Sequence, residues 1–138
     1  MKKRLVLVVS IMLVMLSAQV MAKNVKLWYA WTGQEKEAML GLIAEYEQLS
    51  GNTVSAEPTT FDGLQGKYQI MAPQGQGPDV VIGPADWIGP FVVQNLLHPI
   101  DGYVNEDDKK DFIPTTIEAC KYNNKLYGLP ESFKCVAL

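Results

Sequence analysis

Two short segments of the sequence place a tryptophan beside small polar residues: Trp31-Thr32-Gly33-Gln34 and Gly83-Pro84-Ala85-Asp86-Trp87. The flat face of an indole ring packs against the apolar C–H face of a pyranose, while carboxylate, amide and hydroxyl oxygens accept hydrogen bonds from its hydroxyl groups. This combination predicts a carbohydrate-binding site. Its candidate residues are Trp31, Thr32, Gln34, Asp86 and Trp87. The alternative for either tryptophan is a place in the hydrophobic core, where large aromatic side chains are common.

Residues that could support catalysis or metal binding are sparse. His98 is the single histidine, and it lies between Leu97 and Pro99 without the cysteine or histidine neighbours of a metal site. The serines lack a plausible histidine base. We therefore expect neither enzymatic activity nor a metal or other cofactor. The alternative from the enzyme class is an exported glycoside hydrolase that uses Asp86 and Glu131 as its two carboxylates.

The apolar pattern alternates between strand and helix periods along the chain. Strands are predicted at residues 25–31, 52–57, 79–82 and 125–129, and helices at residues 35–50, 61–72, 86–96 and 114–122. Short loops between alternating strands and helices favour βαβ units, so the predicted fold class is α/β with a mainly parallel sheet and flanking helices. Ligands bind outside the carboxyl ends of the strands in such a sheet. Both tryptophan segments follow a predicted strand and therefore belong at that edge.

Helical spacing also predicts which side chains face the sheet. The inner residues are Met39, Leu42, Ile43, Tyr46 and Leu49 in the first helix, and Phe61, Leu64, Tyr68 and Met71 in the second. The charged segment at residues 105–111 predicts a solvated helix start, with its acidic residues near the positive end of the helix. A functional acidic patch is the alternative for this segment.

The first 22 residues have the layout of a signal peptide. Basic residues at positions 2–4 precede an apolar run at residues 5–16, and Val20-Met21-Ala22 forms a cleavage site. The apolar run is shorter than the ~20 residues that span a membrane. We therefore expect a periplasmic chain that begins at Lys23, with an uncleaved membrane anchor as the alternative. Since no cysteine lies near the cleavage site, a lipid anchor is not indicated.

The remaining residues 23–138 fit a single domain, because domains commonly have ~100–150 residues. Removing the first 22 residues takes away three of the 12 basic residues and none of the 15 acidic ones, which leaves a net charge of −6. This acidic balance argues against a nucleic-acid partner. Cys120 and Cys135 would share an oxidising compartment, and their spacing leaves both a disulfide and free thiols open.

Three motifs accompany the signal peptide: a Val25-Lys26-Leu27-Trp28 strand, the run QGQGPDVV at residues 74–81 before Ala85-Asp86-Trp87, and the run KLYGLP at residues 125–130. Together they resemble the maltose and maltodextrin-binding proteins of ABC importers. The resemblance implies the first lobe of a two-lobed periplasmic binding protein. It further implies a monomeric receptor that closes over an oligosaccharide ligand and presents it to a membrane permease, without catalysis.

Two features depart from that family's pattern. Family members continue beyond the position of Leu138 into a second lobe, so the resemblance implies that residues 23–138 are a first lobe, truncated before the second. Lys134 stands where the family has a glutamate that accepts hydrogen bonds from sugar hydroxyls, whereas a lysine only donates. Lys134 is therefore a further candidate ligand-binding residue, and its alternative is a solvent-exposed position. The remaining alternative for the chain is a truncated gene product without a function of its own.

Overall fold

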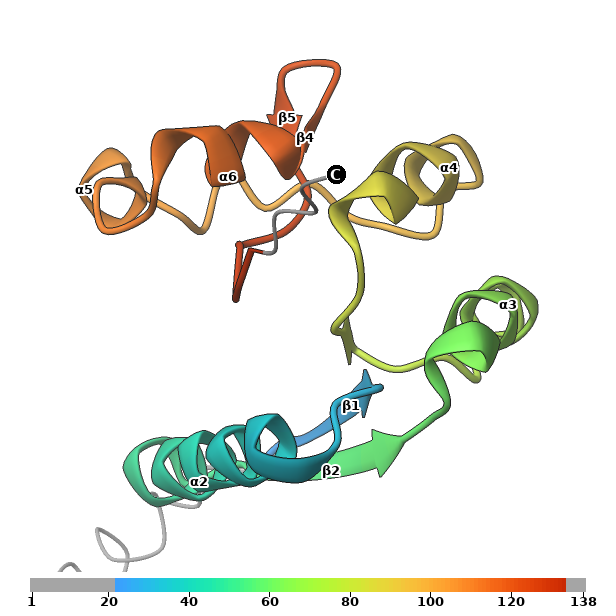
Figure 1. Ribbon diagram of the computed structural model, residues 1–138, viewed down its shortest axis with the longest axis vertical. Coiled ribbons are helices and arrows are strands. Elements are labelled where there is room, and N and C mark those ends of the chain that lie inside the picture. Colours follow the sequence, from blue (N-terminus) through green and yellow to red (C-terminus); the bar gives the residue numbers. More distant parts are fainter. Residues whose placement is uncertain (1–21, 134–138) are drawn as a thin grey trace, which may run out of the picture.

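The structure of the chain is a computed structural model that describes residues 22–133. A three-stranded parallel sheet lies at one end of it (Figure 1). Its strands are β1 (Asn24–Tyr29), β2 (Thr53–Pro58) and β3 (Val80–Val81), in the order β2-β1-β3. Leu27 of β1 pairs with Ala56 of β2 on one side and with Val80 of β3 on the other, in parallel in both cases. The predicted α/β fold class with a parallel sheet is confirmed.

The two-residue strand β3 is held against β1 by the residue that precedes it. The backbone N–H of Lys26 donates a hydrogen bond to the Asp79 carboxylate at 2.8 Å, and the backbone N–H of Asp79 donates to the Lys26 carbonyl at 2.9 Å. This reciprocal pair adds a side-chain contact to a very short ladder. It therefore helps to set the register of β3 and of the loop that follows it.

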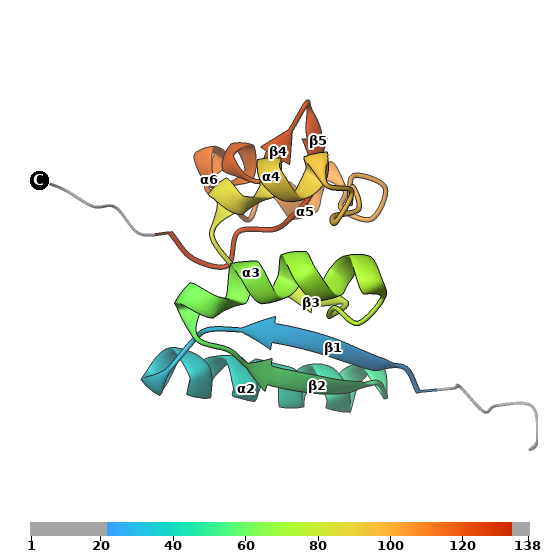
Figure 2. The same cartoon turned by 90° about the vertical axis from the view of Figure 1, so that its right-hand side faces the viewer.

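Two helices connect the parallel strands and cover opposite faces of the sheet (Figure 2). α2 (Gly33–Ser50) leads from β1 to β2, while α3 (Phe61–Met71) and the 3-10 turn η1 (Ala72–Gln74) lead from β2 to β3. Gly51 follows the last residue of α2, and its φ of 70° is the left-handed conformation that glycine adopts most readily at a helix end. Both connections therefore follow the predicted strand–helix–strand order.

Because successive side chains of a strand point to opposite faces, β1 contributes to two separate core clusters. The first cluster contains Leu27, Tyr29 and Met39, and it joins the sheet to α2. The second contains Trp28, Leu64, Tyr68 and Phe91, and it joins the sheet to α3 and α4. The sheet is therefore packed on both faces, as a parallel sheet requires.

The second half of the described chain forms a smaller layer above α3 (Figures 1 and 2). In chain order it contains the 3-10 turn η2 (Ala85–Trp87), α4 (Ile88–Val93), α5 (Glu106–Lys109), α6 (Pro114–Ala119), β4 (Lys121–Tyr122) and β5 (Lys125–Leu126). Ile117, Cys120 and Leu126 form its buried centre, and Ile88 of α4 packs against them. This layer shares α4 with the cluster over the sheet, which links the two parts of the structure.

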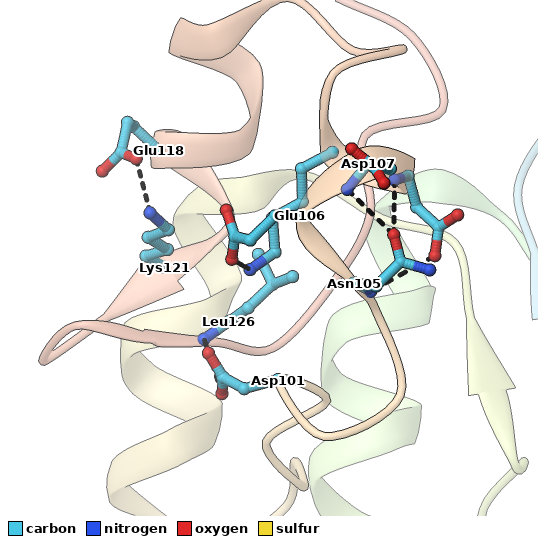
Figure 3. A network of polar contacts seen from close by, with 9 residues as sticks. Asp101, Asn105, Glu106, Asp107, Glu118, Lys121 and Leu126 are labelled. Carbon is cyan, nitrogen blue, oxygen red and sulfur yellow. Dashed lines mark hydrogen bonds and ion pairs between the residues drawn. The ribbon is translucent and has the colours of Figure 1, made fainter.

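Polar contacts brace the surface of this second layer (Figure 3). Both carboxylate oxygens of Asp101 accept a hydrogen bond from the Leu126 backbone N–H at 3.1 Å. Asn105 caps α5, since its side chain accepts from the N–H groups of Asp107 and Asp108 at 2.9 and 2.8 Å. The predicted solvated helix start at residues 105–111 is thereby confirmed as a capped, exposed helix turn.

The predicted helix at residues 86–96 is shorter in the structure. It begins as η2, and α4 ends at Val93 because Asn95 adopts a φ of 56°, in the left-handed region. Asparagine tolerates this conformation better than most residues. The backbone N–H of Asn95 donates to the Val92 carbonyl at 3.0 Å, which closes the last turn.

The predicted strand at residues 125–129 is also shorter and does not join the parallel sheet. It is the two-residue β5, which pairs antiparallel with β4. Asn123 and Asn124, with φ of 48° and 61°, form the two-residue turn between them, as hairpins of this kind require. The predicted helix at residues 114–122 is also shorter in the structure. It ends at Ala119, because Lys121 and Tyr122 belong to the hairpin as β4.

The predicted inner face of α2 is only partly correct. Met39 is buried and Ile43 is half-buried, but Leu42 and Leu49 are 67% and 80% exposed. Positions 39 and 43 therefore make the contact with the sheet, and the apolar side chains at positions 42 and 49 point mainly to solvent.

Candidate carbohydrate-binding site

Three loops leave the carboxyl ends of the parallel strands at one edge of the sheet, and Figure 2 shows α2 and α3 beginning there. Thr59 follows β2, and its backbone N–H donates to the Tyr29 carbonyl at 2.8 Å. Ile82 follows β3, and its backbone N–H donates to the Trp28 carbonyl at 2.9 Å. Backbone hydrogen bonds therefore hold the loops after β2 and β3 against the end of β1. The loops comprise residues 30–32, 59–60 and 82–84, with η2 continuing the last of them.

The loop after β3 folds into η2 and carries Trp87 at the end of that turn. The Trp87 backbone N–H donates to the Pro84 carbonyl at 3.1 Å. Its half-buried indole packs against the cluster over α3, with its ring centroid 5.9 Å from that of Phe91. Trp87 therefore contributes to the core and keeps part of its surface accessible at the edge of the sheet.

Asp86 lies beside Trp87 in the same turn, and its side chain is exposed. Within residues 22–133 its carboxylate makes no hydrogen bond and no ion pair. A carboxylate without an internal partner can accept hydrogen bonds from a ligand without giving up a contact of the fold.

The loop after β1 places Thr32 and Gln34 at the surface of the same edge. Thr32 is the residue before α2, but its side chain makes no capping hydrogen bond to the helix. Gly33 has a φ of 57°, a left-handed conformation that allows the chain to turn directly from the strand into the helix. Both polar side chains are therefore available to solvent or to a ligand.

The two tryptophans belong to different core clusters. Trp31 is half-buried and packs with Leu27 and Met39 on the face covered by α2. Trp87 packs with Trp28 on the opposite face. The structure therefore brings Asp86 and Trp87 together in one turn, but it does not join Trp31 and Trp87 into one aromatic surface.

Phe61 corrects one sequence prediction and adds a residue to the site. It was expected on the inner face of α3, yet its side chain is 59% exposed. As the first residue of α3 it lies at the loop end of the helix, where its ring centroid is 6.0 Å from that of Trp87. Its position after a predicted strand, the same criterion that selected both tryptophans, was the signal that could have found it.

Thr59 is a second residue that was not among the predicted site residues. Its hydroxyl oxygen is buried at the carboxyl end of β2 and has no hydrogen-bond partner in the described part of the chain. Threonine in a strand-rich segment gives no sequence signal for such a position. It adds a polar atom to the same edge as Asp86.

Some predictions fall on residues outside the described range. They are the signal peptide, the ligand role of Lys134 and the participation of Cys135 in a disulfide. Cys120 is a free cysteine in the structure, and burial raises the pKa of its thiol. Over residues 22–133, no cluster of histidine, cysteine and acidic side chains could hold a metal ion, and no helix has the length and apolarity to cross a membrane.

Comparison with known proteins identifies relatives over most of the chain. Residues 30–134 match the family described as bacterial extracellular solute-binding protein. A maltotriose-binding protein of Pyrococcus abyssi is 32% identical over 115 residues, which cover 83% of this chain and 25% of the relative. A galactooligosaccharide-binding protein of Bacillus subtilis is 27% identical over 109 residues, which cover 78% and 25%.

The fold is similar to that of solved sugar-binding proteins. The maltotriose-binding protein of Thermus thermophilus, solved with maltotriose, superposes with a TM-score of 0.73 and 30% sequence identity. The superposition covers 77% of this chain and 28% of that protein. The chain thus spans about a quarter of the length of its relatives. The predicted resemblance is confirmed, and the chain belongs to the bacterial extracellular solute-binding protein family.

Proposed function

We propose that residues 23–138 form the first-lobe part of an exported receptor for a maltose- or maltodextrin-type oligosaccharide. The observation that carries this proposal is the turn that presents Asp86 and Trp87 at the carboxyl edge of the sheet. It combines an exposed carboxylate without a partner in the described chain with the half-buried indole of the next residue. A neutral sugar matches both groups, because its hydroxyls donate to the carboxylate and its C–H face packs on the ring.

The relatives support a binding role and not a catalytic one. Both sequence relatives named above are binding proteins for oligosaccharides, and the structural neighbour was solved with maltotriose. In the proposed receptor, the sugar is held between this lobe and a second one that closes over it by a hinge motion. The closed, monomeric receptor then delivers its ligand to the membrane permease of an ABC importer in the periplasm.

A lobe that presents only one side of a binding cleft leaves much of its ligand in water. We therefore expect residues 23–138 alone to bind maltotriose weakly, with a dissociation constant on the order of millimolar, near −4 kcal/mol. Lys134 remains a proposed contact of the ligand. Its ammonium would donate to a sugar oxygen, in place of the acceptor that the family carries there.

The proposal is tested by titrating the isotope-labelled chain, purified from periplasm, with maltotriose while recording backbone amide resonances. The expected result is a set of saturable shifts in the three loops at the carboxyl edge of the sheet and in η2. Sucrose at the same concentrations controls for viscosity and non-specific effects. Maltotriose that shifts no resonance in these segments, or that shifts only distant ones, refutes the proposed site.

A further inference from the structure

The first turn of α3 contributes an aromatic side chain to the edge where Asp86 and Trp87 lie. Phe61 is 59% exposed although it is large and apolar, and the fold uses little of its surface. Its ring centroid is 6.0 Å from that of Trp87, and the two ring planes are tilted by 37°. This distance is within the range of aromatic contacts, so Phe61 packs beside Trp87 and still keeps more than half of its surface exposed.

The indole of Trp87 is held in place by the loop beneath it. A Cβ atom at Gly83 would lie 2.5 Å from Cζ3 and 2.7 Å from Cε3 of Trp87, so the six-membered part of the indole rests on the Gly83 backbone. Gly83 is not among the glycines with a positive φ. The requirement for glycine at this position therefore comes from the ring of Trp87 and not from the backbone conformation.

Phe91 supports the same indole from the core side. Its ring centroid is 5.9 Å from that of Trp87, and Phe91 itself is 2% exposed. Trp87 is thus fixed between Gly83, Phe91 and Phe61. Of the two aromatic partners of Trp87, Phe61 alone keeps a large accessible surface.

We propose that Phe61 and Trp87 form one aromatic platform, seated on Gly83, that binds a pyranose ring of the ligand, with Phe61 as its accessible contact. This inference rests on the proposed function and adds residues that set its specificity. Two adjacent aromatic rings favour a ligand with an extended C–H surface, such as neighbouring glucose units of a maltodextrin. Asp86, next to Trp87 in the chain, accepts from the hydroxyls at the rim of that surface.

The test compares Phe61→Ala and Phe61→Leu with the unchanged chain by saturation-transfer NMR, in which aromatic protons of the protein are irradiated and maltotriose is observed. The unchanged chain should transfer magnetisation to the C–H protons of the sugar. Phe61→Ala should lower both the transfer and the affinity about three- to tenfold, and Phe61→Leu should restore only part of the affinity, because it supplies apolar area without a ring face. Phe61→Trp should retain both.

Tyr103→Ala is the matched control, because Tyr103 is an aromatic residue that is 84% exposed in the second layer of the structure. It should leave affinity and transfer unchanged. Because Phe61 is exposed, its variants should also keep the unfolding midpoint of the chain, which circular dichroism measures. The proposal would be overturned if Phe61→Ala lost affinity only because it unfolded, while Phe61→Leu stayed folded and kept its affinity.

Gly83→Ala tests the contact between the Gly83 backbone and the Trp87 ring. The added methyl should displace the indole, shift the Trp87 side-chain N–H resonance in the absence of sugar, and lower affinity at least as far as Phe61→Ala. Maltotriose binding by the unchanged chain together with equal affinity in Phe61→Ala would refute the platform while leaving the proposed function intact. No transfer from any residue of the unchanged chain would refute both.

Discussion

The ammonium group of Lys67 lies 3.8 Å from the centroid of the Trp28 ring, so a charge on α3 sits directly over the central strand. The same ammonium lies 3.6 Å from the Glu57 carboxylate, and Glu57 pairs with Trp28 across β1 and β2. Trp28 is 2% exposed, whereas the side chains of Lys67 and Glu57 are 32% and 54% exposed. Lys67 therefore joins α3 to both strands through one contact with a buried ring and one exposed ion pair.

Lys67→Met should lower the free energy of unfolding by about 1 kcal/mol, because it keeps the apolar stem but removes the cation from the ring. Glu57→Gln removes only the ion pair and should cost less than about 0.5 kcal/mol, since exposed pairs contribute little. Urea unfolding followed by circular dichroism measures both changes. Equal losses in the two variants would assign the effect to the ion pair and not to the ring.

Asp79→Ala should shorten or loosen the pairing of β3 with β1. The variant removes the 2.8 Å hydrogen bond from the Lys26 N–H and should lower the free energy of unfolding by about 1–2 kcal/mol. Asp79→Asn keeps a side-chain oxygen acceptor and should lose less than half of that. Faster hydrogen exchange at the amides of residues 26 and 82 would locate the change. Unaltered exchange at both amides in Asp79→Ala would contradict the role of this contact.

Most of the sheet and its helices could be predicted because each leaves a strong local pattern. Residues 25–31 alternate across a strand, and residues 35–50 combine helical spacing with a glycine at the helix end. The short loops between them then restrict the topology to parallel βαβ units. The hairpin of β4 and β5 was predicted less well, because two residues per strand give no period. Its main signal was the Asn123-Asn124 turn.

The candidate site could be predicted only in part. The polar residues and tryptophans after β1 and β3 were found because parallel strands bring their carboxyl ends to one edge. The side of the sheet to which each ring turns depends on packing, so the separation of Trp31 from Trp87 had no sequence signal. Phe61 was assigned to the inner face for the same reason: helical spacing does not tell whether the first turn of α3 still lies over the sheet.

Cys120 should react slowly with alkylating reagents in the folded chain. It is 5% exposed, and burial raises the pKa of its thiol, so little thiolate forms near pH 8. In a Cys135→Ser variant, where Cys120 is the remaining thiol, iodoacetamide should react at least about tenfold more slowly than in denaturant. Because the folded state holds this proton more tightly than the unfolded state, stability should decrease as the pH rises through the thiol range. Rapid native labelling would contradict the burial of Cys120.

Export should remove the first 22 residues. N-terminal sequencing of the periplasmic protein should begin at Lys23, because a small residue at position 22 is what the signal peptidase requires. Ala22→Trp should leave an uncleaved chain in the membrane fraction, while Ala22→Ser should be processed normally. A periplasmic chain that begins at Met1, or normal processing of Ala22→Trp, would refute this cleavage site.

Asp86 should favour neutral sugars over anionic ones. Its exposed carboxylate has no partner within residues 22–133, so in the bound state it accepts from sugar hydroxyls and repels phosphate or carboxylate groups. Removing a charged acceptor typically costs ~1.5–3 kcal/mol, and the lower value applies here because the site is open to water. Asp86→Ala should therefore weaken maltotriose binding about tenfold.

Asp86→Asn separates the charge of this side chain from its hydrogen bonds. The amide keeps an acceptor oxygen, so affinity for maltotriose should fall less than in Asp86→Ala, while the affinity for maltose phosphate should rise because the repulsion is gone. Asp111→Asn is the matched control, since Asp111 is an exposed carboxylate far along the chain beyond α5. NMR titrations with both ligands measure the four affinities. If Asp86→Asn and Asp111→Asn change the two ligands' affinities equally, the effect comes from the net charge of the chain, and Asp86 is not the acceptor at the site.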